Sequence, residues 1–486
     1  NYFDRMGSTM KDWQNRPFWW KGADGHSRVL CWCPSRGYAL GHLIGDGEAF
    51  ARFLPGYLTE LETNSYPYDI TYLRWNVHGD NGSPDERIAD VVRDWNARYI
   101  FPHVIISTTA EAFRNFEARY GNALPEYSGD YTPYWEDGAG SSARETGLNR
   151  ASAERLVQAE TLWAMLRPSP FPAADFQETW RNILLYSEHT WGAYNSISQP
   201  DLPFVQEQWK VKQGFAIDAD QESRELLRRA LAAGELNAAA HSTAAAPAKD
   251  IAPAHASAVH VSRTVEILNT SSWPRTDLVT LPPELSQAGD LVLDEHGTAV
   301  PSQRLSNGDL AVLARDVPAF GSRRYRVRPG SSPARRGAFA KVPRLGSSDF
   351  FVRISEQNGA ITNLFSRVLS QDLLATNSRV GLNSFFYLPG SDLKGLETSG
   401  KPLISVKERG PLVASLLIES SAQGCRSLTR EVRVIEGLGR VEIINTIDKL
   451  PVREKEGLHF GYDFDVPSGV MRMDVGWAEV RPELDQ

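Results

Sequence analysis

Three short segments of the sequence carry side chains that could do chemistry, and one of them holds a histidine within a helical pattern. His189 follows Leu185 by four positions and Tyr186 by three, so the three residues would share one face of a helix. No His-x-x-x-His or Cys-x-x-Cys motif accompanies it, so a local zinc motif is absent. By spacing alone, His189 fits a hydrogen-bonded structural residue better than a metal ligand.

A second segment, His78-Gly79-Asp80-Asn81-Gly82, follows a predicted strand that ends at Trp75. Functional groups in α/β sheets gather at the carboxyl ends of strands. Asp80 is therefore a candidate carboxylate catalyst, and His78 and Asp80 together are a candidate metal-binding pair. The residue types alone favour the alternative, an ordinary Asp-Asn-Gly turn.

The third segment, Asp130–Gly138, is dense in aromatic and acidic residues and lies between two differently patterned regions. A junction between domains is a favoured place for a ligand pocket. Tyr134 and Trp135 are candidates to stack on a sugar ring, while Asp130 or Glu136 would bind its hydroxyl groups. A packed loop between domains explains the same residues equally well.

Strands and helices alternate in the first part of the sequence. Such alternation indicates a parallel α/β layer, which is partial here because too few units are present to close a sheet or barrel. The predicted strands are 28–33, 69–75 and 103–107, and the predicted helices are 84–99 and 108–120, the latter with Thr108 and Glu111 at capping-box spacing and Gly121 as its stop.

Helical periodicity then continues with prolines between the segments, which predicts an antiparallel three-helix bundle. An Ala-rich tract at 237–258 predicts a linker, and short β-rich runs after it predict a β-sandwich with a hairpin at Gly437-Leu438-Gly439. The predicted bundle helices are 143–166, 173–194 and 204–236.

The fold class predicted from these patterns is multidomain. A partial parallel α/β domain at 1–135 precedes a three-helix bundle at 136–236, a linker at 237–258 and a β-sandwich region at 259–486. With 486 residues, the chain is long enough to bury more than one core.

Composition excludes several classes of protein. A formal net charge of −8 disfavours a nucleic-acid partner and an anionic lipid surface. No run of 18 apolar residues is present to span a membrane, and three cysteines are too few for a disulfide framework. We therefore expect a soluble protein, while its compartment and oligomeric state are not fixed by the sequence.

Together these segments resemble glycoside hydrolase family 38, the class II α-mannosidases, and especially its bacterial members. The more specific parts of the resemblance are Tyr134-Trp135-Glu136-Asp137-Gly138 and Glu188-His189-Thr190-Trp191-Gly192. The order of the predicted regions also fits. Further matching stretches are Asn1–Gly7, Pro17–Trp20, Val77–Pro84, Thr132–Arg150, Val265–Asn269 and Trp273–Thr276.

The resemblance implies a retaining glycosidase that holds one zinc ion and cleaves α-mannosides in an oligosaccharide or simple glycoside. It implies that 1–135 is the carboxyl-terminal part of the catalytic domain, that the bundle is the family's middle domain, and that the sandwich is galactose-mutarotase-like. By position, His189 resembles the family's carboxyl-terminal zinc ligand, and Trp135 the aromatic residue that lines the sugar pocket beside Tyr134.

The other site residues follow from the same resemblance. Asp80 lies near the family's acid/base region, with Asp85 as the alternative because Asn81 stands where the family pattern has a second acid. Tyr387 resembles a residue in a sandwich segment that reaches the site and binds substrate, and Phe385 competes for that register.

The sequence also departs from the family. The family's remaining zinc ligands, an early His-x-Asp motif and the nucleophilic Asp, would lie upstream of the Asn1–Gly7 match. We therefore expect a chain truncated at both ends, with an incomplete zinc site and no turnover by itself. The alternatives are a non-catalytic carbohydrate-binding or scaffold protein, and a glycosidase for another sugar.

Overall fold

The structure is a computed structural model of mixed α and β composition. Its residues form two compact units, Asn1–Ser141 with Ser468–Gln486, and Ser142–Pro467. The described residues are 16–22, 24–33, 41, 44, 46–76, 82–128, 142–166, 170–188, 196, 198–242 (backbone alone from 233), 262–332, 337–375, 380–475 and 478–481.

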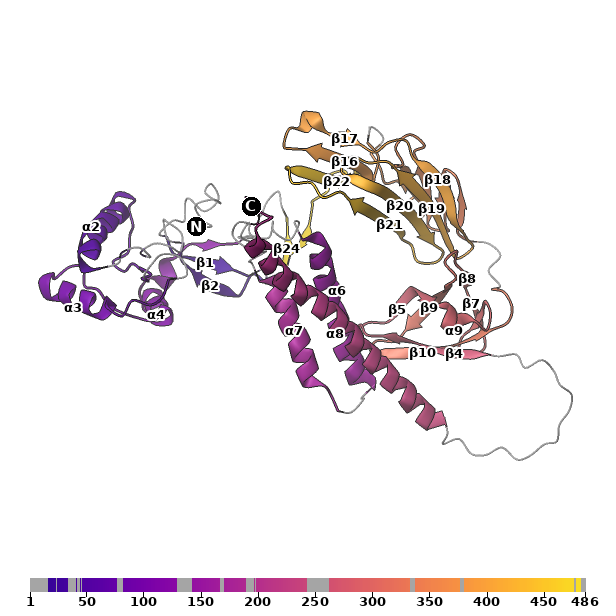
Figure 1. The fold of residues 1–486 in the computed structure, drawn as a ribbon, viewed down its shortest axis with the longest axis horizontal. Helices are drawn as coiled ribbons and strands as arrows, with labels where there is room; N and C mark the ends of the chain where they lie inside the picture. The colour runs from indigo at the N-terminus through magenta and orange to yellow at the C-terminus, as the bar shows by residue number, and fades with distance from the viewer. Residues whose placement is uncertain are drawn as a thin grey trace. The chain divides into compact units, whose positions relative to one another are not determined.

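A three-stranded sheet lies in the first unit. β1 (Phe18–Lys21) pairs with β2 (Arg28–Cys31) in antiparallel fashion and with β3 (Glu126–Tyr127) in parallel (Figure 1). The strand predicted at 28–33 is thus found over its first four residues. The sheet is mixed, so the predicted parallel layer is found only in the β1–β3 pair.

Three helices complete the described core of this unit: α2 (Gly47–Thr63), α3 (Ile88–Arg98) and α4 (Thr109–Tyr120). The predicted start of α4 is confirmed, because Thr108 Oγ1 accepts a hydrogen bond from the Glu111 amide at 3.2 Å. Gly121 follows the helix as predicted. It has right-handed backbone angles and continues into a short 3-10 turn, so it does not end the helix as a left-handed cap.

The strands predicted at 69–75 and 103–107 are wrong. The first segment is extended but has no ladder partner among the described residues, and Leu73 and Trp75 pack against α2 instead. In the second segment the side chains of Ile105 and Ile106 are exposed. A β-branched run becomes a strand only where a neighbouring strand supplies backbone partners, and neither segment pairs with a strand among the described residues.

The second unit begins with three helices that share one core: α6 (Ala143–Leu166), α7 (Ala173–Ser187) and α8 (Pro203–Ser242). Figure 1 shows them side by side. α6 has the predicted bounds, whereas α7 ends seven residues early. α8 runs six residues into the predicted linker, because Ala is the strongest helix former and the Ala-rich tract extends the helix.

Two sheets packed on one core follow the bundle. One sheet has the order β4-β10-β6-β7 and the other β5-β9-β8. Val265, Val312 and Tyr325 are among the buried residues between them. The strands are β4 (Arg263–Asn269), β5 (Arg275–Leu281), β6 (Leu291–Leu293), β7 (Ala299–Val300), β8 (Ser302–Arg304), β9 (Leu310–Val317) and β10 (Gly321–Arg328), with the short helix α9 (Pro283–Ser286) after β5.

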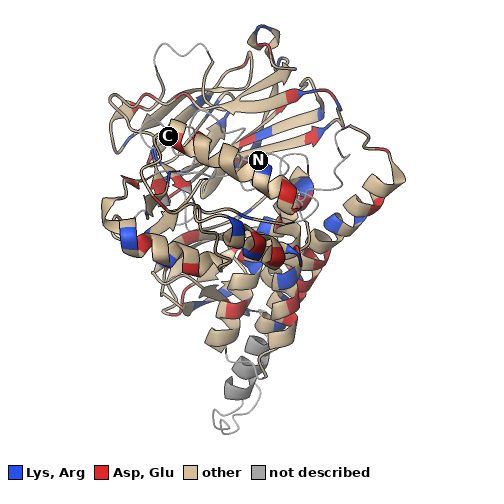
Figure 2. Cartoon of the chain, turned by 90° about the vertical axis from the view of Figure 1, so that its left-hand side faces the viewer, with Lys and Arg blue, Asp and Glu red and all other residues tan. Residues whose placement is uncertain are grey.

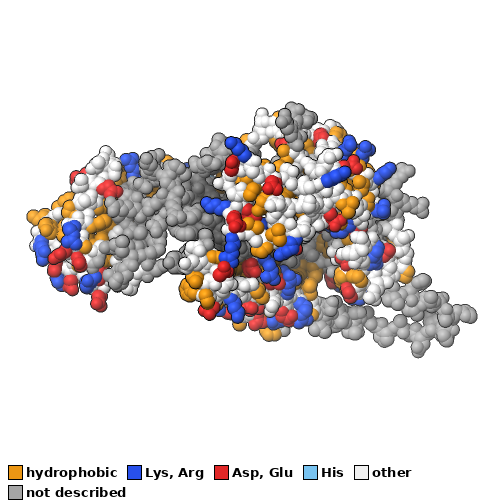
Figure 3. All heavy atoms as spheres, turned by 45° about the horizontal axis from the view of Figure 1, so that its top comes forward, with side chains coloured by type: hydrophobic (Ala, Val, Ile, Leu, Met, Phe, Trp, Pro, Cys, Tyr) orange, Lys and Arg blue, Asp and Glu red, His pale blue; other side chains and the backbone are white. Residues whose placement is uncertain are grey.

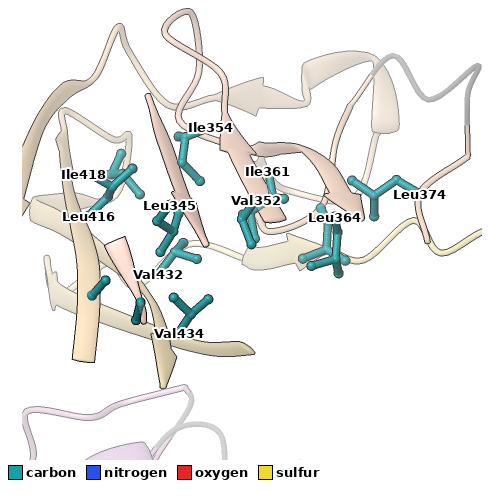
Figure 4. Packing of buried hydrophobic residues seen from close by; sticks show 13 residues of the cluster. Leu345, Val352, Ile354, Ile361, Leu364, Leu374, Leu416, Ile418, Val432 and Val434 are labelled. Atoms are coloured by element: carbon teal, nitrogen blue, oxygen red, sulfur yellow. The ribbon is translucent and has the colours of Figure 1, made fainter. Parts of the chain in front are cut away.

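A second and larger pair of sheets follows, so the single predicted sandwich region contains two packed cores. The sheets have the orders β11-β12-β13-β14-β15 and β18-β19-β20-β21. The side chains labelled in Figure 4 point from both sheets into the core between them. The strands are β11 (Phe339–Lys341), β12 (Arg344–Gly346), β13 (Phe350–Ile354), β14 (Ile361–Ser366), β15 (Gln371–Asp372), β18 (Leu403–Arg409), β19 (Val413–Ser420), β20 (Cys425–Ile435) and β21 (Val441–Lys449).

The hairpin predicted around Gly437-Leu438-Gly439 is confirmed. It joins β20 to β21, which begin pairing at Val434 and Val441. Both glycines have positive φ, which a side chain would disfavour in such a tight turn. A smaller sheet, β17-β16-β22, packs beside this region. Its strands are β16 (Ser384–Pro389), β17 (Glu397–Thr398) and β22 (Glu456–Gly461).

Charged side chains of both signs are interspersed along the described elements (Figure 2), and the face in Figure 3 shows the same mixture. Across the residues that the structure describes, no helix combines the length and apolar character needed to cross a membrane.

Candidate functional site

Most of the predicted site residues lie outside the described residues. These are Asp80, Tyr134, Trp135 and His189, and the same holds for His78. Tyr387 and its alternative Phe385 are described, as is Asp85. The structure also describes the helix end that directly precedes His189.

The end of α7 is held by a buried lysine of α8. Lys212 Nζ donates hydrogen bonds to the backbone oxygens of Leu185 at 2.9 Å and Glu188 at 2.8 Å, and lies 3.3 Å from Glu188 Oε2. An ammonium group that binds the last carbonyls satisfies acceptors that the helix itself leaves open. The helix ends at Ser187, and Glu188 has an extended backbone. His189, which the spacing places within this helix, lies outside the described residues.

Contacts from α6 fix the other side of the same helix end. The Tyr186 hydroxyl donates to Ser142 Oγ at 3.1 Å and lies 2.9 Å from Thr146 Oγ1. Asn149 Nδ2 donates to Ser187 Oγ at 3.0 Å. Tyr186 is 1 % exposed, so its contacts are shielded from water, whereas Ser187 and Glu188 are exposed. The helix end directly before His189 is thus held by one buried tyrosine and by polar contacts to both neighbouring helices.

The sequence pattern did not reveal this anchor. Lys212 lies between Val211 and Gln213 in a helix of ordinary sequence. Its helical spacing nevertheless places it on the apolar face of α8, together with the fully buried Val205, Ala216 and Ala219. A lysine on an apolar face requires a polar partner inside the bundle.

Tyr387 lies in the interior of the β16 sheet. Its side chain is 5 % exposed and packs in one cluster with Phe385 and Leu428. The ring lies against Gly424, where an added Cβ would come within 2.4 Å of the ring edge. Gly424 also has a φ of +73°, so both its backbone and its lack of a side chain are required there.

The hydroxyl of Tyr387 faces an ion pair. A side-chain hydrogen bond with Glu456, together with burial, raises the pKa of Tyr387 to about 12. Lys449 Nζ lies 2.5 Å from Glu456 Oε1 and balances the carboxylate charge. At neutral pH the phenol therefore remains protonated, and it can donate a hydrogen bond but cannot act as a base or a nucleophile.

Asp85 is held in contacts that keep it ionised. Its Oδ2 accepts from Trp75 Nε1 at 3.0 Å, and its Oδ1 accepts from the backbone amide and Nε of Arg87, both at 3.0 Å. The Arg87 hydrogen bond is the main cause that lowers the pKa of Asp85, against the effect of burial. A general acid needs a raised pKa, so this geometry suits a structural carboxylate at the start of α3 better than a proton donor.

The largest buried polar side chain belongs to a residue that the sequence reading did not single out. Arg430 of β20 is 0 % exposed and donates to the backbone oxygens of Asn358 at 2.8 Å and Asn383 at 3.3 Å, and to Ser420 Oγ at 3.1 Å. Burial lowers the pKa of Arg430 to about 10, so it stays charged at neutral pH. The sequence could have indicated this, because Arg430 takes an inward position of an alternating strand, between the apolar residues Leu428 and Val432.

The described residues offer no metal site. Within them, no three His, Cys, Asp or Glu side chains converge as a group that would hold an ion. A catalytic zinc needs three protein ligands, and the candidate ligands His189, His78 and Asp80 all lie outside the described part. We therefore derive no chemical step through zinc.

Neither comparison with known proteins gives a relative. No family model matches the chain, and no curated protein matches it.

Proposed function

We propose that this chain belongs to a zinc-dependent retaining glycosidase that cleaves α-mannosides, as its sequence resemblance implies. The observation that carries the proposal is the anchored end of α7, directly before Glu188-His189-Thr190-Trp191-Gly192. A metal ligand must be held in place by the surrounding structure, and Lys212 and Tyr186 supply fixed contacts one to four residues before His189.

The order of elements also supports the proposal. A mixed α/β unit precedes three packed helices, and two pairs of antiparallel sheets follow them. This is the order that the resemblance implies for the family. Under this proposal Asp80 serves as the acid/base, because Asp85 is engaged by Arg87 and Trp75.

The test measures hydrolysis of p-nitrophenyl α-mannoside by the natural full-length protein, together with its zinc content. We expect chelation to abolish hydrolysis and the His189→Ala variant to lose most of its zinc. His296→Ala is the matched control, because His296 is exposed in a surface turn and should retain both zinc and activity.

Full activity after chelation, together with normal zinc content in His189→Ala, would contradict the proposal. Binding of mannosides without any hydrolysis would instead favour the carbohydrate-binding alternative. Asp80→Asn should remove activity while Asp85→Asn should mainly lower stability, and the reverse result would make Asp85 the acid/base.

A further inference from the structure

The outer face of the five-stranded sheet β11–β15 carries a row of cations. In the strand register, Lys341 lies opposite Arg344, Arg344 opposite Arg353, and Arg353 opposite Asn363. Directly opposed residues of antiparallel strands point to the same face. Three cations on three neighbouring strands therefore stand side by side, and all three are exposed.

A second row on the same face is aromatic. Phe339 lies opposite Gly346, Gly346 opposite Phe351, and Phe351 opposite Phe365. The Phe339 ring covers Gly346, where an added Cβ would lie 2.9 Å from the ring. This row is two residues along each strand from the cations, a separation of about 7 Å.

Within the described residues, Lys341, Arg344 and Arg353 form no ion pair. Like charges placed directly opposite on a sheet are destabilising, so folding alone would favour a neutral or acidic residue at one of these positions. Functional sites are places where proteins are expected to break such local rules.

A cavity of about 470 Å³ opens on this face. It is lined by Arg344, Arg353, Phe351, Thr362 and Asn363. The volume lies within the range of small-molecule pockets, about 300–1,000 Å³. Asn363 Nδ2 is engaged by Asp372, and the Thr362 hydroxyl donates to the Arg353 backbone oxygen at 3.3 Å. The Asn363 amide oxygen and the Thr362 oxygen are therefore placed to accept hydrogen bonds from ligand hydroxyls.

We infer that this cavity is a binding site for an acidic sugar, in which Arg344 and Arg353 bind the anionic group and Phe351 packs against the sugar ring. Neighbouring strands are about 4.8 Å apart, so the two guanidinium groups bracket a single oxyanion. Arginine binds carboxylate and phosphate groups through paired N–H donors. The apolar ring face and the hydroxyl-binding groups then select a sugar over a simple anion.

The observations favour a compact ligand over a long polyanion. The cationic row spans three strands, about 10 Å, and the chain as a whole carries a net charge of −8. A nucleic acid would extend past this short cationic row and be repelled by the net negative charge of the rest of the protein. The site is independent of the glycosidase proposal, because none of its residues belongs to the predicted catalytic or zinc site.

The test titrates galacturonate and glucose 6-phosphate into the protein by calorimetry, with glucose and inorganic phosphate as reference ligands. We expect both acidic sugars to bind, more weakly as salt is raised, and glucose not to bind. The tighter of the two identifies the anion as carboxylate or phosphate. Arg344→Ala and Arg353→Ala should each weaken binding about tenfold or more.

Two variants separate the parts of the site. Phe351→Ala should weaken binding of the acidic sugars and leave inorganic phosphate unaffected. Arg409→Ala is the matched control, because Arg409 is an exposed arginine of β18 in the facing sheet without an ion pair in the described part of the chain. Thermal unfolding of each variant shows that its fold is intact.

Unchanged binding of the acidic sugars in the Arg344→Ala, Arg353→Ala double variant would overturn the inference. Inorganic phosphate binding as tightly as glucose 6-phosphate would overturn the role of the sugar ring. Tighter binding of a single-stranded oligonucleotide than of either acidic sugar would overturn the choice of ligand.

Discussion

The two large sheets β11–β15 and β18–β21 share one core but differ in the charges on their outer faces. On β20 and β21, Arg433 lies directly opposite Glu442 and forms an ion pair with it. On β12 and β13, Arg344 lies directly opposite Arg353. Both sheets bury the same kinds of aliphatic side chains on their inner faces.

The comparison separates residues that stabilise the sheet from residues that a ligand would require. The paired face is what folding favours, because opposite charges attract across strands. The face with three cations opposes folding slightly and must be offset by the shared core. A cationic row that forms no ion pair among the described residues is what the inferred ligand site would require.

The largest effect should come from the inner face of β12. Leu345 is 0 % exposed, and Leu345→Ala should lower the free energy of unfolding by about 2–5 kcal/mol through lost burial and a new cavity. Urea unfolding measures it, and Arg344→Ala, the neighbouring outward residue, is the control. Equal effects at the two positions would refute the division into inner and outer faces.

A smaller loss should follow when the paired face is made to resemble the cationic one. Glu442→Arg places two arginines opposite each other and should lower the free energy of unfolding by about 1 kcal/mol. Glu442→Gln should have a smaller effect, since it removes the attraction without adding repulsion. If Glu442→Arg is as stable as the parent in low salt, the charge argument is wrong.

The reverse change should stabilise the cationic face. Arg344→Thr removes repulsion from both neighbours and introduces a residue that favours strands, so the free energy of unfolding should rise by about 0.5 kcal/mol. High salt should shrink the gain, because it screens exposed charges. A loss of stability in Arg344→Thr would show that the row contributes to the fold.

The smallest effect should be on how the stability of the protein depends on pH in the acidic range, where Asp277 loses its charge. Burial, the largest single influence, opposes ionisation of Asp277, but hydrogen bonds from Arg440, the Leu278 amide and Arg275, with the charge of Arg440, together outweigh it and lower the pKa of Asp277. Its contribution to stability is therefore complete above the ordinary value of 3.8 and is lost as the pH falls through the lowered value. Thermal unfolding between about pH 5 and about pH 2 should show a weaker acid dependence in Asp277→Asn.

Much of the second unit could be predicted from the sequence. Helix α6 has the predicted bounds, and the hairpin at Gly437 joins the two expected strands. These features depend on local periodicity and turn chemistry, which neighbouring residues determine. The predicted strands at 69–75 and 103–107 failed because a strand needs a partner, and no local pattern supplies one.

The candidate site was less predictable. Histidine spacing placed His189 on a helix, whereas Lys212 from another helix ends α7 before it. For Asp85, the alternative acid/base residue, nothing in the local sequence indicated that Arg87 and Trp75 would bind its carboxylate. For Asp85, contacts made on folding therefore changed the role that its residue type suggested.

The sequence by itself determined α4, α6, the hairpin turn at Gly437, the alternating apolar positions and the resemblance to a glycosidase family, whereas α2 was not predicted and α7 was predicted too long. Only the tertiary structure decided which strands pair, and therefore that Lys341, Arg344 and Arg353 stand in one row beside Phe351. Along the chain these residues lie in three separate short strands, and nothing in their local sequence indicates that they share a face. Strand register brings them together, and register is set by long-range packing of the inner face.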